Sequence, residues 1–153
     1  MNTLVLPKLI TPVHAGFRDL ELPEAFSWEA GIDQTAIHGL YVVAFRSLRN
    51  LQAPPEMIDQ LLELDGDATE EAQHMPGFHT YWHDDDLSAE GYGLSFCLWD
   101  SREEAKHAAQ QPKHRAAVMY ARGEGREVYL SYDIETHNIF RFAGAKIVFA
   151  LAA

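Results

Sequence analysis

The segment Tyr92-Gly-Leu-Ser-Phe-Cys-Leu-Trp99 is followed, after one residue, by Ser101-Arg-Glu-Glu104. Large apolar side chains alternate with smaller ones in the first segment, and this period of two predicts a β-strand. Ser101 and Glu104 have the spacing of a capping box, in which the serine hydroxyl accepts a hydrogen bond from the Glu104 amide. We therefore expect a buried strand that leads directly into a helix.

The chain on both sides of this segment predicts further strands and helices. Runs rich in β-branched and aromatic residues indicate strands at 39–48, 78–83 and 127–134. Apolar spacing after Pro54-Pro55 predicts a helix that is expected to end at Asp65-Gly66-Asp67, with a further helical turn near 69–72. The helix after Ser101 should be interrupted at Pro112 and end near Gly123. A C-terminal hairpin, formed by 140–142 and 146–151 around Gly144, is expected to add a fifth strand.

The order strand, helix, strand, strand, helix, strand is that of the ferredoxin-like split βαβ arrangement, an α+β fold with an antiparallel sheet. A chain of 153 residues has enough material for one core and too little for two comfortable domains. We therefore expect a single domain over 1–153. It would consist of an extension at 1–36, a ferredoxin-like core at 37–135 and a C-terminal β extension at 136–153.

The strand at 39–48 is apolar on both faces, with Val42 and Ala44 on one face and Tyr41, Val43 and Phe45 on the other. Two helices can cover only one face of a four-stranded sheet, and an exposed apolar face would drive association. We favour a two-fold homodimer in which the sheets of two subunits pack together. The alternative is that residues 1–36 fold across this face of the sheet.

The charge and composition of the chain limit the kinds of molecule that it is expected to bind. Twelve Lys and Arg against 23 Asp and Glu give a formal charge of −11, which disfavours binding to nucleic acid or to an anionic membrane. No apolar run approaches the ~20 residues that span a bilayer, and residues 1–10 make a poor signal peptide. The single cysteine, Cys97, cannot form an internal disulfide, so a cytoplasmic location is the default expectation.

Four short motifs, in this order, resemble one known family: Pro76-Gly77-Phe78, Ser95 to Ala105, His114-Arg-Ala-Ala117 and Tyr129-Leu-Ser-Tyr132. Together they are similar to the antibiotic-biosynthesis-monooxygenase-like group of the dimeric α+β barrel superfamily. In that group a Pro-Gly-Phe opens the second strand, and a tryptophan closes the third strand before a Ser-x-Glu-Ala helix start. A His-Arg-x-Ala segment lies further along that helix. The resemblance covers about residues 37–135.

The resemblance implies a ligand cavity between the helices and the sheet of each subunit. The group includes cofactor-free monooxygenases that act on polycyclic phenols, haem-degrading enzymes and small isomerases. We therefore expect a monooxygenase-like enzyme that acts on a hydrophobic aromatic or enolisable small molecule without a cofactor. The alternative is a non-catalytic dimer that binds such a ligand or haem.

Trp99 and His114 match family positions, and the resemblance implies catalytic roles for them. A tryptophan edge offers a stacking surface and one N–H donor, and a histidine can accept a proton near neutral pH. Such a base could deprotonate a phenol or enol, and the resulting carbanion could then give an electron to oxygen. The structural alternative places Trp99 in the core and His114 at the surface or at a helix cap.

Further polar residues are candidates for substrate binding. His79, Tyr81 and His83 occupy alternate positions on one strand and should share a face, and His107 is a fourth candidate. His79 and His83 would lie about 13 Å apart at ~3.3 Å per residue, too far for one metal ion, so we predict no metal site. His107 or His114 could ligate haem. However, the family's haem degraders share an asparagine early in the first strand, and residues 40–45 contain none.

Overall fold

The structure is a computed structural model that describes residues 5–33, 39–142 and 145–152. Its central sheet has the strand order β2-β3-β1-β4-β5, and all neighbouring strands are antiparallel. This is the expected ferredoxin-like order with one added strand, and the α+β class is confirmed. The strands are β1 (Leu40–Arg49), β2 (Phe78–Trp82), β3 (Tyr92–Trp99), β4 (Tyr129–Phe140) and β5 (Val148–Leu151).

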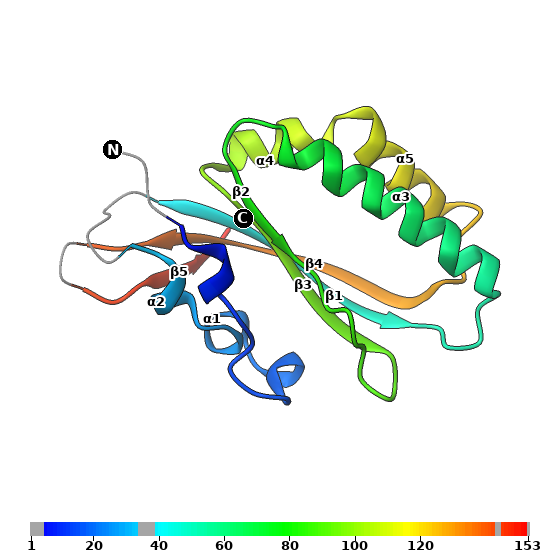
Figure 1. Cartoon of the computed structure of the whole chain (residues 1–153), viewed down its shortest axis with the longest axis horizontal. Coiled ribbons are helices and arrows are strands. Elements are labelled where there is room, and N and C mark those ends of the chain that lie inside the picture. Colours follow the sequence, from blue (N-terminus) through cyan, green and yellow to red (C-terminus); the bar gives the residue numbers. More distant parts are fainter. Residues whose placement is uncertain (1–4, 34–38, 143–144, 153) are drawn as a thin grey trace.

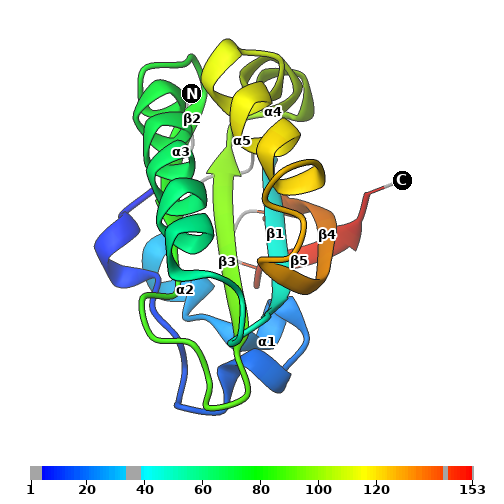
Figure 2. The ribbon, with the colours of Figure 1, turned by 90° about the vertical axis from the view of Figure 1, so that its right-hand side faces the viewer.

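Three helices cover one face of the sheet (Figure 1), namely α3 (Pro55–Gln73), α4 (Arg102–Ala109) and α5 (Pro112–Arg122). Helices α3 and α5 lie side by side (Figure 2). The predicted cap is present, because the Ser101 hydroxyl accepts a hydrogen bond from the Glu104 amide at 3.3 Å. Among the described residues, no helix is long and apolar enough to cross a membrane.

Helix α3 corrects one expectation, because it does not end at Asp65-Gly66-Asp67 but continues to Gln73. An isolated glycine inside a helix costs only about 1 kcal/mol relative to alanine, and packing of the flanking turns can outweigh that. Buried Leu61 and Ala68 provide this packing on either side of Gly66. A Cβ atom added at Gly66 would meet nothing within 4 Å, so there is open space next to this residue.

The C-terminal region forms a hairpin, but its first strand is longer than expected. Strand β4 runs through residue 135, the boundary expected for the core, and ends at Phe140. Residues 140–142 are therefore not a separate strand. Strand β5 pairs with the end of β4 in the register Phe140↔Val148, and the turn expected at Gly144 lies outside the described residues.

The other face of the sheet is covered by the N-terminal segment of the same chain, defined here as residues 5–33 (Figure 1). This segment contains two single 3-10 turns and two short helices: Pro7–Leu9, Phe17–Asp19, α1 (Leu22–Ala25) and α2 (Trp28–Gly31). Phe26 and Trp28 pack on Phe96 of β3, with ring centroids 4.8 and 4.7 Å apart. In the described segment, residues of the same chain thus occupy the sheet face for which a second subunit was the favoured cover.

Arginine side chains join the N-terminal segment to the rest of the protein. Arg46 of β1 donates to the carbonyl oxygens of Arg18 and Leu20 at 2.9 and 2.8 Å. Three ion pairs involve the arginines at this junction: Arg18–Asp84, Arg46–Glu135 and Arg141–Glu29. A sheet-to-sheet homodimer of the kind that we favoured would have to displace this segment, so dimerisation through this face stays a prediction.

Candidate functional site

The helix-covered face of the sheet presents a row of rings instead of a filled core. Successive ring centroids are 5.0 Å apart for Tyr129 and Tyr132, 6.1 Å for Tyr132 and Phe45, 6.4 Å for Phe45 and Tyr81, and 5.7 Å for Tyr81 and His83. Although Tyr132 and its neighbour Ile134 point toward the helical layer, they are 48% and 58% exposed. The helices therefore do not close completely over the sheet.

A cavity of about 430 Å³ lies between α3 and this face. Its walls come from α3, β1, β2, β3, the loop after β2 and the start of β4. The polar side chains that line it include Arg49, Asp65, Tyr81, His83 and Tyr129. A cavity of this size can hold a small organic molecule. Its lining is mostly polar and includes the rings of Tyr81, His83 and Tyr129.

Asp65 is the carboxylate that the fold directs into this cavity. It shares one face of α3 with Leu61, Ala68 and Ala72, because residues three or four apart lie above one another on a helix. The Tyr81 hydroxyl donates to Asp65 Oδ2 in a long hydrogen bond of 3.5 Å. Burial raises the pKa of Asp65, and the electrostatic influence of the nearby His83, the Tyr81 hydrogen bond and His114 act against this rise. Asp65 is thus a stronger base than an ordinary aspartate, yet it stays accessible to water.

His114 lies half-buried in the first turn of α5, near Asp65. The backbone amides of Lys113 and His114 donate to the Glu71 carboxylate at 3.1 and 3.2 Å, so a side chain of α3 caps the start of α5. Burial lowers the pKa of His114, whereas Asp65 and Glu71 act to raise it. The imidazole is therefore mostly neutral near pH 7 and able to accept a proton.

Trp99 has a different environment from the one that the resemblance implies. It is 3% exposed and packs with Tyr41 and Ala108 in a small core beneath α4. Its ring meets Phe78 edge to face at 5.3 Å, and its Nε1 donates to Cys97 Sγ at 3.1 Å. Both its stacking surface and its donor are thus used within the protein, and Trp99 is not among the residues that line the cavity.

The four substrate-binding candidates separate into two groups. Tyr81 and His83 line the cavity. The register of β2 shifts between Phe78 and Thr80, which interrupts the expected alternation, and His79 Nε2 lies 2.5 Å from Asp100 Oδ1. His107 is exposed on α4, outside the cavity lining. His79 thus lies against Asp100 and is not among the residues that line the cavity.

Sequence reasoning missed Asp65, Arg49 and Tyr129. A signal for Asp65 was present, because an acidic residue four positions after Leu61 and three before Ala68 falls on the apolar face of the helix. Arg49 and Tyr129 meet across β1 and β4 only because the register shifts between Leu48 and Arg49. Nothing in a single sequence marks such a shift.

The described residues do not fit haem. His107 is exposed on α4, and neither His107 nor His114 lines the cavity. The cavity lining holds four carboxylates (Asp65, Glu70, Asp84 and Asp85) and one arginine, which disfavours a dianion such as haem with its two propionates. Within the described ranges, no group of three or more His, Cys, Asp or Glu residues is placed to hold a metal ion.

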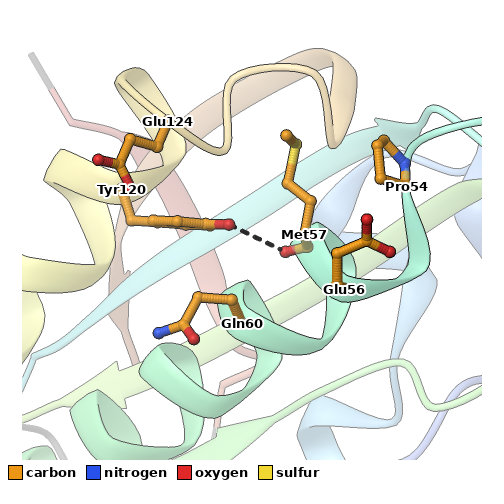
Figure 3. A pocket seen from close by; sticks show the side chains of 6 residues that line it. All are labelled: Pro54, Glu56, Met57, Gln60, Tyr120 and Glu124. Carbon is orange, nitrogen blue, oxygen red and sulfur yellow. Dashed lines mark hydrogen bonds between the residues drawn. The ribbon is translucent and has the colours of Figure 1, made fainter.

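A second hollow, of about 500 Å³, lies where the start of α3 meets the end of α5 (Figure 3). Its walls are formed by Pro54, Glu56, Met57, Gln60, Tyr120 and Glu124. The Tyr120 hydroxyl donates to the Met57 carbonyl at 3.5 Å. These six residues include no histidine, cysteine or cation and no residue of the sheet, so we place the candidate site in the cavity beneath α3.

Comparison with known proteins places the chain in a family. The family described as PB2B2.08-like matches residues 5–150, which includes the N-terminal segment. The UPF0643 protein PB2B2.08 of Schizosaccharomyces pombe is 31% identical over 101 residues, or 65% of this chain and 44% of that protein. The match thus spans less than half the length of this curated relative.

Solved structures resemble the fold at low sequence identity. A candidate antibiotic biosynthesis monooxygenase from Nitrosomonas europaea superposes with a TM-score of 0.51 at 7% identity, over 72% of this chain and 97% of that chain. A dimeric protein of unknown function and ferredoxin-like fold from Bacteroides fragilis gives 0.51 at 14% identity, over 70% and 100%. The fold expected from the resemblance is confirmed, and at these identities the likeness concerns the fold alone.

Proposed function

The chain belongs to the PB2B2.08-like family, and we propose that it is a monooxygenase-like enzyme acting on a small hydrophobic aromatic or enolisable molecule bound beneath α3. In this proposal Asp65 removes a proton from a C–H group of the ligand, and His114 on the neighbouring helix relays it. The resulting carbanion gives one electron to dioxygen, and the radical pair joins to form a C–O–O⁻ peroxide. The proton returns to the peroxide, and loss of water, with cleavage of the O–O bond and of the remaining C–H bond at that carbon, leaves a carbonyl. No cofactor takes part.

The observation that supports this proposal is the position of Asp65. A leucine there would continue the apolar stripe of α3 and fill the space above Tyr81. A carboxylate leaves that space open and weakens packing, and such local conflicts concentrate at functional sites.

The surroundings of Asp65 suit proton transfer. A base works best when its pKa lies near the working pH, and burial moves the pKa of Asp65 in that direction. Neutral His114 on the neighbouring helix could accept the proton next. The rings of Tyr81 and Tyr129 line the cavity and offer surfaces on which a flat ligand can stack.

The test is oxygen uptake by the full chain with enolisable aromatics such as anthrone and 1-naphthol, with products identified by mass spectrometry. Asp65→Asn should lower kcat by about 100-fold or more, the usual loss when a general base is removed. Glu63→Gln changes the same charge on the exposed side of α3 and should leave kcat unchanged. Equal turnover by Asp65→Asn and the unaltered protein would exclude the assigned role, as unchanged turnover by His114→Ala would for His114.

A binding protein without turnover is the second candidate. It is favoured by the position of Trp99, whose ring and N–H contact Phe78 and Cys97. This candidate predicts that the same aromatics perturb the NMR signals of Tyr81 and Tyr129 while neither oxygen nor ligand is consumed.

A further inference from the structure

Arg49 differs from the other arginines that are partly buried near the sheet. Arg18, Arg46 and Arg141 each form an ion pair with a carboxylate. Among the described residues no such pair includes Arg49. Its Nε, like that of Arg141, is buried without a hydrogen-bond partner, but Arg141 is neutralised by Glu29 and Arg49 has no such carboxylate within the described ranges. Because a buried donor without a partner is unfavourable, this guanidinium is available to a ligand in the cavity that it lines.

The register shift at the end of β1 places a hydroxyl beside this cation. Regular pairing after Leu48↔Ser131 would put Leu130 opposite Arg49, but the shift puts Tyr129 there and leaves Leu130 67% exposed. Bulges of this kind redirect side chains and are frequent next to active sites. Burial raises the pKa of the Tyr129 phenol and the neighbouring Arg49 opposes the rise, so the hydroxyl stays protonated and can donate.

The row of rings connects this end of the cavity to Asp65. It begins at Tyr129, passes Tyr132 and Phe45, and reaches Tyr81, whose hydroxyl contacts Asp65. Of these rings, Tyr129 and Tyr81 line the cavity, so a flat molecule held at Arg49 would lie between them and direct its other end toward Asp65.

We propose that Arg49 and Tyr129 form an anion-binding subsite that holds the carboxylate of an aromatic monoanion. An arginine fork can donate two parallel hydrogen bonds to a carboxylate, and the Tyr129 hydroxyl can add a third. A monoanion suits this site better than a phosphate dianion, because the same cavity is lined by four carboxylates. The inference rests on the proposed function, since it names the class of ligand that the cavity beneath α3 would take.

The test compares two probes of nearly equal shape, 2-naphthoate and the neutral 2-naphthalenemethanol. Each is titrated into the ¹⁵N-labelled full chain, and Kd is obtained from the NMR shifts. The unaltered protein should bind the carboxylate at least about tenfold more tightly, as expected for charge-assisted hydrogen bonds. Arg49→Gln should remove that preference without changing the Kd of the alcohol. Arg49→Lys, which keeps the charge but not the fork, should retain part of it.

Arg115→Gln is the matched control, because it removes the same charge from an exposed position on α5. It should behave as the unaltered protein. A carboxylate preference that survives in Arg49→Gln, or the absence of any preference in the unaltered protein, would overturn the inference. Neither result would decide the proposed function, which depends on oxygen uptake and its loss in Asp65→Asn.

Discussion

The two faces of the sheet are built in opposite ways from the same strands. Against the N-terminal segment, Val42, Ala44 and Phe96 are completely buried in a continuous apolar core. Against the helices, Tyr41 and Trp99 of the same strands form only a small core beneath α4, and Ser47, Arg49 and Ser95 line an open cavity beneath α3. One face is thus packed for stability, whereas the other leaves packing incomplete where a ligand could bind.

This division resembles the stability–activity trade-off of many enzymes, in which residues that suit a ligand site make the folded state less stable. Here the two requirements act on different sides of each strand. Substitutions on the two faces should therefore have opposite consequences for stability and ligand binding.

The largest expected effect is the loss of stability in Phe96→Ala. Truncation of a fully buried phenylalanine usually lowers the free energy of unfolding by about 3–5 kcal/mol. Phe45→Ala, on the partly open face of β1, should cost less than about 2 kcal/mol because less surface loses contacts there. Urea denaturation monitored by circular dichroism gives both values. Equal losses in the two variants would contradict the division of the sheet into a packed and an open face.

A smaller effect is expected from Arg46→Met, which detaches the N-terminal segment at one point. The variant removes the ion pair to Glu135 and leaves the carbonyls of Arg18 and Leu20 without their donor. We expect a loss of about 2 kcal/mol and faster proteolytic cleavage within the segment. Arg115→Met, at an exposed position, is the control. Unchanged cleavage would mean that Arg46 does not hold the segment.

The smallest effect is a gain of stability in Asp65→Asn. Because the pKa of Asp65 is raised in the folded state, its ionised form destabilises that state once the pH exceeds the folded pKa. The asparagine variant should be more stable at neutral pH by less than about 1 kcal/mol, since Asp65 remains accessible to water. The gain should vanish at a pH low enough to protonate Asp65. Thermal denaturation across pH measures it, and lower stability of the variant at pH 7 would refute the assignment.

Much of the fold follows from local patterns in the sequence. The order of strands and helices could be predicted from local patterns such as the strand at 92–99 and the Ser101 cap. The apolar residues on both faces of β1 also predicted that a second layer of protein covers the sheet face without helices. The identity of that cover did not follow, because residues 5–33 show no sustained period and their contacts lie far away in the chain. Contacts between residues that are far apart in the chain leave no pattern in the local sequence, so they could not show which segment covers the sheet.

The candidate site was less predictable than the fold. Tyr81 and His83 could be found because they follow the strand period, but the same period did not reveal that His79 lies against Asp100, outside the cavity lining. The family position of Trp99 did not reveal that Cys97 takes its N–H. The Asp65-Gly66-Asp67 sequence predicted a helix end. Because α3 in fact continues to Gln73, that prediction did not identify Asp65 as a residue on the face of α3 that carries Leu61 and Ala68.

The packing of the N-terminal segment also affects how the protein is made. Glu29 binds Arg141, 112 residues later in the chain, and Trp28 packs against Phe149. Phe26 and Trp28 also pack on Phe96, so during synthesis at the ribosome this segment gains some apolar partners with β3 and the last of them only near the end of the chain. Such non-local contacts slow folding and prolong the time during which apolar, aggregation-prone surface is exposed. Nascent chains of this protein should accordingly depend on chaperones until translation has passed Phe149.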